Sequence, residues 1–134
     1  MSGKTLAEKL GIRPGTAIWA SPASRLDVIG SLPEDVRVLR GPKEGAAALL
    51  FVDDLAAARE AAARHAERLL GMAPVWVAYP KGNRADLNRD TLWPPFAEHG
   101  MRPIGQVALD EVWSALRFRP LRDGEGPFTG GGRR

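Results

Sequence analysis

Two short apolar runs without polar alternation most constrain the fold of this chain. They span residues 47–52 and 75–79, and polar residues follow each of them. A strand with one face in solvent alternates apolar and polar residues, whereas a strand covered on both faces is apolar throughout. The two runs therefore predict buried strands of a parallel sheet with helices on both faces.

The segment between these runs has the periodicity of a helix. From Leu55 to Leu70, apolar residues recur three or four positions apart with charged residues between them. Asp53 and Asp54 can cap this helix, and Gly71 can end it. A strand, a helix and a second strand in this order form the unit that joins neighbouring parallel strands.

The N-terminal part of the chain repeats this alternation. Thr5 and Glu8 have the spacing of a capping box, and Ser24 can cap a later helix. The expected elements are a helix over residues 6–10, a strand over 16–20, a helix over 25–32 and a strand over 36–39.

The C-terminal third predicts one more helix and then a hairpin. Asn88 or Asp90 can cap a helix that reaches about His99, in which Pro94 and Pro95 fit only the first turn or interrupt it. The strands expected after this helix span residues 104–109 and 113–118. Their connection is too short for a parallel crossover, so they should pair antiparallel.

The order of these elements predicts a single Rossmann-like α/β domain over residues 1–120. We expect a three-layer sandwich whose mainly parallel sheet of about six strands ends in an antiparallel hairpin, an outline similar to a shortened methyltransferase domain. Residues 121–134 are rich in Gly and Arg and are expected to form a flexible tail.

Composition excludes several kinds of site. The chain has no cysteine, so disulfides, thiolate metal ligands and a cysteine nucleophile are excluded. His65 and His99 are its two histidines, and we expect both on the surface and no metal site. The sequence contains no run of about 20 apolar residues, the length that a membrane-spanning helix needs. The N-terminus does not resemble a signal sequence. A cytoplasmic location is expected.

The charge of the chain is only slightly basic. Its 19 basic and 16 acidic side chains give a net charge of +3, and arginine outnumbers lysine. The basic residues do not gather in a stripe with interleaved aromatic residues, the pattern typical of nucleic-acid binders. The sequence therefore argues against a nucleic-acid partner, although a nucleic-acid-associated protein stays open as an alternative.

Four segments of the chain resemble a bacterial family. These segments are residues 9–15, 49–52, 76–81 with Asp86 and Leu87 after them, and 110–118. They are similar to a family catalogued as a domain of unknown function, number three-zero-five-two in that series, over about residues 6–120. The resemblance implies a small Rossmann-like fold without an assigned activity. Relatives often have a longer Ser/Gly-rich loop after the lysine at position 81.

The loop after the second apolar run carries the candidate ligand site. Its candidate residues are Lys81, Gly82, Asn83, Arg84, Asp86, Asn88 and Arg89. Ligands bind at the carboxyl ends of parallel strands, and Lys, Arg and Asn side chains with free backbone N–H groups suit a phosphate or carboxylate. We therefore expect a small anionic ligand here. Alternatively, Asp86 and Asp90 pair with these cations and Asn88 only caps the helix.

Two aromatic residues form a second candidate surface. Trp93 and Phe96 flank two prolines at the expected start of a helix and could anchor a protein partner or a second copy of this chain. Alternatively, Trp93 covers the sheet as part of the core.

The sequence lacks the usual signals of a cofactor-dependent Rossmann enzyme. The first strand-to-helix turn, residues 20–24, contains no glycine, and no acidic residue ends the second strand. We therefore expect no cofactor and no catalytic residues, and a binding or regulatory module. A divergent S-adenosylmethionine-dependent enzyme similar to the methyltransferases is the alternative.

Overall fold

The helices and strands of this chain alternate through most of its length. The computed structural model describes residues 5–82 and 86–128. Its elements are α1 (Leu6–Lys9), β1 (Ala17–Ser21), the 3-10 helix η1 (Ala23–Ile29), β2 (Arg37–Leu39), β3 (Ala47–Phe51), α2 (Leu55–Leu69), β4 (Val75–Pro80), α3 (Arg89–Ala97), β5 (Met101–Ala108) and β6 (Trp113–Pro120).

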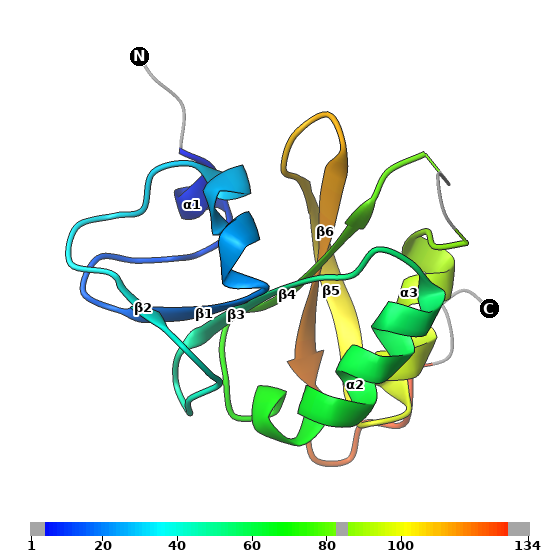
Figure 1. The fold of residues 1–134 in the computed structure, drawn as a ribbon. Helices are drawn as coiled ribbons and strands as arrows, with labels where there is room; N and C mark the ends of the chain where they lie inside the picture. Colours follow the sequence, from blue (N-terminus) through cyan, green and yellow to red (C-terminus); the bar gives the residue numbers. More distant parts are fainter. Residues whose placement is uncertain (1–4, 83–85, 129–134) are drawn as a thin grey trace.

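The strands form a six-stranded sheet in the order β2-β1-β3-β4-β6-β5 (Figure 1). The first four are parallel, whereas β6 runs antiparallel to both β4 and β5. The two apolar runs, β3 and β4, lie at the centre, and β3 is buried along its whole length. The predicted mainly parallel sheet with a C-terminal antiparallel hairpin is confirmed.

Helices cover both faces of this sheet, as predicted for a three-layer sandwich. On one face, α2 and α3 contact each other (Figure 1) and cover a core cluster that includes Leu50 and Phe96. The core on the other face includes Leu10, at the end of α1, and Trp76 of β4. The Trp76 indole N–H donates to the Leu10 carbonyl oxygen at 2.8 Å, which fixes the end of α1 to the central sheet.

The predicted caps of three helices are present. Thr5 and Glu8 form the reciprocal capping box of α1. The Asp54 carboxylate accepts a hydrogen bond from the Ala57 N–H at the start of α2. The Asn88 side chain accepts two hydrogen bonds from backbone N–H groups of the first turn of α3.

The segment after β1 differs from the prediction. Pro22 stands at the N-cap of η1 and provides no side-chain hydrogen bond, so the predicted cap at Ser24 is wrong. Because β1 extends to Ser21, only Pro22 separates the strand from the helix, and Ser24 already lies inside the first turn.

The two prolines of α3 lie inside the helix, neither in its first turn nor at its end. Pro94 and Pro95 have no backbone N–H, so the carbonyls of Asp90 and Thr91 lose their intrahelical donors. The helix still forms because its apolar side is held in the core, where Phe96 is 0% exposed.

The hairpin is longer than predicted. β5 already begins at Met101 and β6 reaches Pro120. Pro103 is tolerated because β5 lies at the edge of the sheet. The register shifts between Pro103 and Gly105, where a bulge interrupts the ladder.

The segment after β6 contacts the domain. The structure describes it as far as Phe128, and the Leu121 N–H donates to a backbone carbonyl before β5. The carboxylate of Glu125 pairs with Arg102 and Arg119. Residues 129–134 of the predicted flexible tail lie outside the described residues.

Candidate functional site

A hollow of about 380 Å³ lies at the carboxyl end of β4. This is the end of a parallel strand at which ligands bind in open α/β sheets. The volume is within the range of roughly 300 to 1,000 Å³ that is usual for small-molecule sites. Its lining residues are Tyr79, Lys81, Gly82, Asn88, Arg89, Gln106, Ala108 and Ser114.

Three side chains from three strands form a hydrogen-bonded group in this hollow, which we call the polar floor. The Gln106 side-chain N–H₂ donates to the Tyr79 hydroxyl at 2.7 Å and to the Ser114 hydroxyl at 3.1 Å. The antiparallel pairing of β4 with β6 sets Tyr79 opposite Ser114. Tyr79 is 4% exposed and Ser114 is 5% exposed. In the described part of the chain, the Tyr79 O–H has no acceptor and can donate to a ligand.

Lys81 and Arg89 bring positive charge to the rim of the hollow. The Lys81 backbone N–H donates to the Val112 carbonyl at 2.8 Å, which ties the end of β4 to the turn between β5 and β6. Arg89 is the first residue of α3 and is exposed. Among residues 5–82 and 86–128, neither side chain forms an ion pair.

The remaining predicted loop residues have different surroundings. Asn88 lines the hollow, but its side chain also caps α3, so the N–H groups of Asp90 and Thr91 are already paired. Asp86 accepts a hydrogen bond from the Leu55 N–H at 2.8 Å and thereby caps α2. Asp86 is not among the lining residues of the hollow, and its part in ligand binding stays a prediction. Asn83 and Arg84 lie outside the described residues.

Gly82 is the last of the predicted site residues that line the hollow. Its φ of +73° is a backbone conformation that glycine adopts without strain. A Cβ added there would meet no atom within 4 Å, so a glycine is favoured by the backbone conformation and not by crowding.

The aromatic residues of α3 separate into a core residue and a surface residue. Phe96 is fully buried and packs on Phe118, with ring centroids 4.9 Å apart. A partner could not reach this side chain from the surface. Trp93 is half-buried, and the Phe128 ring contacts it edge-on at 4.7 Å.

A second hollow of about 500 Å³ adjoins the first, because Arg89 and Gln106 line both. Arg102 and Arg119 also line this second hollow, and the Glu125 carboxylate bonds to both of them at 2.7 to 3.0 Å. Hydrogen bonds from Arg119, then from the backbone N–H of Arg122 and from Arg102, hold the pKa of Glu125 well below its usual range.

Sequence reasoning missed the polar floor and this arginine pair. The sequence predicted strands over 104–109 and 113–118, which contain neither Arg102 nor Arg119. The two arginines lie opposite each other because the register shifts between Pro103 and Gly105; a longer hairpin without this bulge would have paired Arg102 with Pro120. Tyr79 and Ser114 could have been found from the antiparallel pairing of β4 with β6, which the sequence did not specify.

The strand order changes direction at β1, because β2 lies on one side of β1 and β3 lies on the other. The carboxyl ends of β1 and β3 therefore form a topological switch point. Such a switch point is the usual place for a nucleotide in an open α/β sheet. Here the Arg25 guanidinium bonds to the Asp53 carboxylate at 3.0 Å and 3.5 Å and lies 5.1 Å from the centre of the Trp113 ring. The charged groups at this point therefore pair with each other.

Comparisons with known proteins bear on the fold. A protein of the NADB-Rossmann superfamily from Streptococcus agalactiae, whose structure is solved, aligns with 96% of this chain and 72% of its own at a TM-score of 0.53 and 10% identity. The fold is Rossmann-like. No family model matches the chain, and no curated protein matches it. The resemblance to the family of unknown function therefore stays a prediction.

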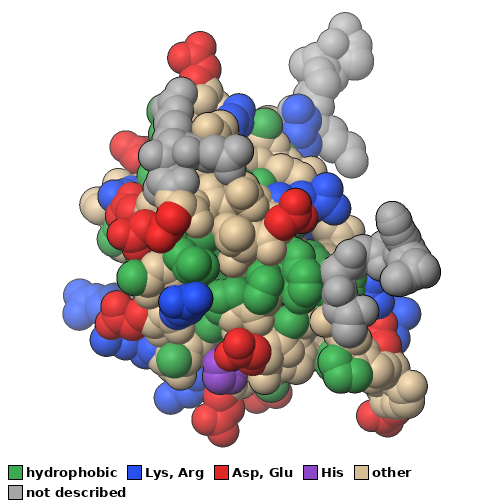
Figure 2. Space-filling view, turned by 90° about the vertical axis from the view of Figure 1, so that its right-hand side faces the viewer, with side chains coloured by type: hydrophobic (Ala, Val, Ile, Leu, Met, Phe, Trp, Pro, Cys, Tyr) green, Lys and Arg blue, Asp and Glu red, His purple; other side chains and the backbone are tan. Residues whose placement is uncertain are grey.

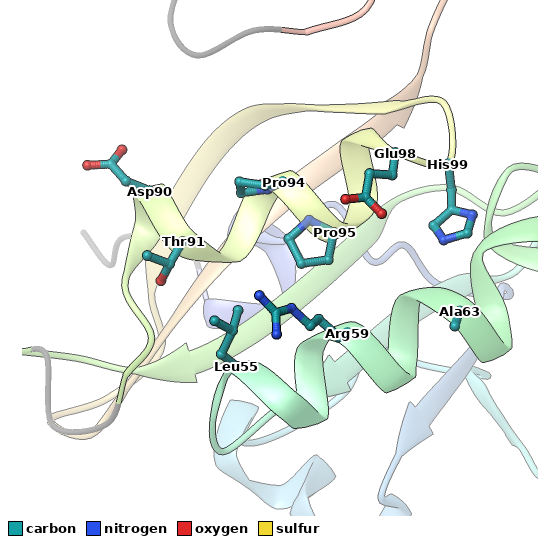
Figure 3. A pocket seen from close by; sticks show the side chains of 9 residues that line it. All are labelled: Leu55, Arg59, Ala63, Asp90, Thr91, Pro94, Pro95, Glu98 and His99. Atoms are coloured by element: carbon teal, nitrogen blue, oxygen red, sulfur yellow. The ribbon is translucent and has the colours of Figure 1, made fainter.

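A groove between the two helices of one layer is the other large concavity of this Rossmann-like domain. It measures about 400 Å³ and lies between α2 and α3. In Figure 3 the Arg59 side chain extends from α2 toward α3, and Pro95 lies above it. Figure 2 shows this side of the molecule, where hydrophobic side chains gather in the middle and charged side chains surround them.

The described residues contain no candidate metal site, since no three His, Asp or Glu side chains lie close enough together to hold an ion. In the same residues, every helix is too short or too polar to cross a membrane. His65 packs edge-on against Trp19, with ring centroids 4.8 Å apart, and burial and the charge of Arg64 lower its pKa.

Proposed function

We propose that this protein binds a small anionic ligand, a phosphate or carboxylate compound, in the hollow at the carboxyl end of β4. One observation carries the proposal: Lys81 and Arg89 stand over the polar floor, and no described carboxylate pairs with either of them. Two positive charges beside buried polar groups favour an anion from solution.

The chemistry of these groups suits an oxyanion. Lys81 supplies a point charge, and the Arg89 guanidinium can donate two parallel hydrogen bonds to one phosphate or carboxylate. The Tyr79 hydroxyl can donate a further hydrogen bond from the floor. Because Tyr79 and Ser114 are almost fully buried, a hydrogen bond to this floor is stronger than the same bond in water.

We propose a binding or regulatory module and not a catalyst. The described residues that line the hollow include no histidine, aspartate or glutamate, the side chains that most often serve as general acid or base. Ser114 is engaged in hydrogen bonds with Gln106 and the Val107 carbonyl, and neither of these is a base that could activate its hydroxyl.

Calorimetric titration with inorganic phosphate and small phosphate esters tests the proposal. Lys81→Ala and Arg89→Ala should each weaken binding about tenfold, which corresponds to about 1.4 kcal/mol. Lys43→Ala is the matched control, because Lys43 is equally charged, exposed and remote from the hollow. If Lys81→Ala binds each compound as tightly as Lys43→Ala does, the proposed site is wrong.

The same titrations address the other proposed classes. S-adenosylmethionine and a nicotinamide dinucleotide belong in the compound set, and binding that survives Lys81→Ala would favour a cofactor site elsewhere in the sheet. A protein partner or homodimer at Trp93 is tested by sedimentation of the free protein and of Trp93→Ala. Membership of the bacterial family of unknown function and a cytoplasmic location remain proposals that rest on the sequence.

A further inference from the structure

The segment that follows β6 places a carboxylate on two arginines beside the proposed ligand hollow. Glu125 accepts hydrogen bonds from Arg102 at 2.7 Å and from Arg119 at 3.0 Å, through both of its oxygens. The two arginines lie opposite each other on β5 and β6. The polarity and geometry of this contact are those of a bound anion held by an arginine pair.

The Glu125 carboxylate does not accept a hydrogen bond from every N–H donor of this arginine pair. Arg102 Nε is buried, and no hydrogen-bond partner for it is present in the described residues. A guanidinium offers five N–H donors, and a carboxylate has only two oxygens with which to accept them. A phosphate group has more oxygens and could also accept the remaining N–H, so the arginine pair suits a larger anion than the one it holds.

The segment that carries Glu125 is attached by few contacts. Gly124 and Gly126 flank Glu125, and both are exposed. Beyond them, the Phe128 ring contacts Trp93 at 4.7 Å and the Arg102 guanidinium at 5.0 Å. The Arg102, Arg119 and Glu125 side chains are each 21 to 33% exposed, so an anion from solution can reach the arginine pair and displace this segment without unfolding the domain.

We propose that Arg102 and Arg119 form a second anion subsite, that Glu125 fills it while no ligand is bound, and that residues 121–128 are a strap displaced by a ligand with two anionic groups. This inference rests on the proposed function, because Arg89 and Gln106 line both hollows and so join the two subsites. The ligand class is a compound with two phosphates, or with a phosphate and a carboxylate.

Titration with inorganic tripolyphosphate tests the second subsite. Glu125→Gln removes the competing charge and should bind tripolyphosphate at least tenfold more tightly than the unchanged protein. Asp123→Asn is the matched control, because it removes the same charge from an exposed position of the same segment. Adding Arg119→Ala to Glu125→Gln should abolish the gain. Equal affinity of Glu125→Gln and the unchanged protein, or an equal gain in Asp123→Asn, would overturn the inference.

The effect of Lys81→Ala on inorganic phosphate separates this inference from the proposed function. If Lys81→Ala weakens phosphate binding but Glu125→Gln binds tripolyphosphate no more tightly than the unchanged protein, the proposed site at β4 is supported and the second subsite is wrong. If only the Glu125→Gln gain and its loss with Arg119→Ala are seen, the arginine subsite stands alone and the proposed function is wrong.

Amide hydrogen exchange measures displacement of the strap in a protein that keeps Glu125. The Leu121 backbone N–H donates to the Gly100 carbonyl oxygen, outside the strap, at 2.9 Å, so it loses its acceptor when the strap leaves. Tripolyphosphate should accelerate exchange at Leu121, and Phe128→Ala should accelerate it before any ligand is added. Slower exchange at Leu121 in the presence of tripolyphosphate would mean that the strap closes over the ligand, which contradicts displacement.

Discussion

The carboxylate of Asp86 accepts a hydrogen bond from the backbone N–H of Leu55 at 2.8 Å, so a residue that follows β4 caps the helix that precedes β4. Asp54 caps the same helix within the same first turn, at the Ala57 N–H. The start of α2 is therefore held by two carboxylates, one local and one from the loop beside the proposed ligand hollow.

Asp86→Ala should lower the free energy of unfolding by about 1 kcal/mol, the usual cost of losing an N-terminal helix cap. Asp86→Asn keeps an acceptor oxygen and should lose less. Urea denaturation followed by circular dichroism measures both. Asp27→Ala is the control, because Asp27 is exposed and its carboxylate makes no hydrogen bond or ion pair with the described residues. Equal stability of Asp86→Ala and Asp27→Ala would mean that the second cap contributes nothing.

Trp76→Phe should destabilise the domain by about 1 to 3 kcal/mol, because it leaves the buried Leu10 carbonyl without its donor. Trp93→Phe is the matched control, since the Trp93 indole N–H donates to no described acceptor and its ring is only half-buried. Urea denaturation of the two variants gives the comparison. A loss for Trp93→Phe as large as that for Trp76→Phe would show that ring volume, and not the hydrogen bond, matters at Trp76.

The sequence predicted the features of this fold that depend on local signals. The non-alternating runs gave the two central strands, because a strand covered on both faces has no position for a polar side chain. Thr5 with Glu8, Asp54 and Asn88 gave the helix starts, because a cap is formed by residues within three or four positions of each other.

The features that the sequence did not predict depend on register or on distant contacts. The position of Arg102 opposite Arg119 follows from a bulge near Pro103, and no local pattern indicates where a ladder slips. The Asp86 bond to Leu55 and the Glu125 bond to Arg102 join segments far apart in the chain. The sequence therefore placed Lys81, Gly82, Asn88 and Arg89 at the end of β4, where they line a hollow, but it did not predict the polar floor; ligand binding there stays a prediction.

His65 should titrate below the ordinary histidine pKa of 6.5, because burial and the charge of Arg64 disfavour its protonated form. In the unfolded chain His65 binds its proton near pH 6.5, so the folded state holds fewer protons just below that pH. The contribution of His65 to stability is therefore complete above pH 6.5 and is lost as the pH falls.

An NMR titration of the His65 ring protons measures this shift directly. His65→Gln does not titrate, so its free energy of unfolding should fall less between pH 7.5 and pH 5 than that of the unchanged protein, in urea denaturation at each pH. A measured pKa of 6.5 or higher for His65 would contradict the prediction and would indicate that its contact with Trp19 does not shield it from water.

Glu125 gives a test of the same sign at more acidic pH. Hydrogen bonds from Arg119, from the Arg122 backbone and from Arg102 lower its pKa in the folded state. Its unfolded pKa is about 4.3, so the stabilising contribution is complete above that value and is lost as the pH falls toward the folded pKa. The difference in stability between the unchanged protein and Glu125→Gln should therefore be largest at neutral pH and shrink below about pH 5.

The strap is the part of the chain in which this loss should first be seen. Protonation of Glu125 weakens its bonds to Arg102 and Arg119, so the Leu121 N–H, which donates to the Gly100 carbonyl oxygen, should exchange faster as the carboxylate is protonated, after correction for the intrinsic pH dependence of exchange. The amides of β3 should keep their protection over the same pH range, because that strand is buried at the centre of the sheet. If Leu121 and β3 lose protection together, residues 121–128 do not detach separately, and the ion pairs of Glu125 belong to the cooperative core of the domain.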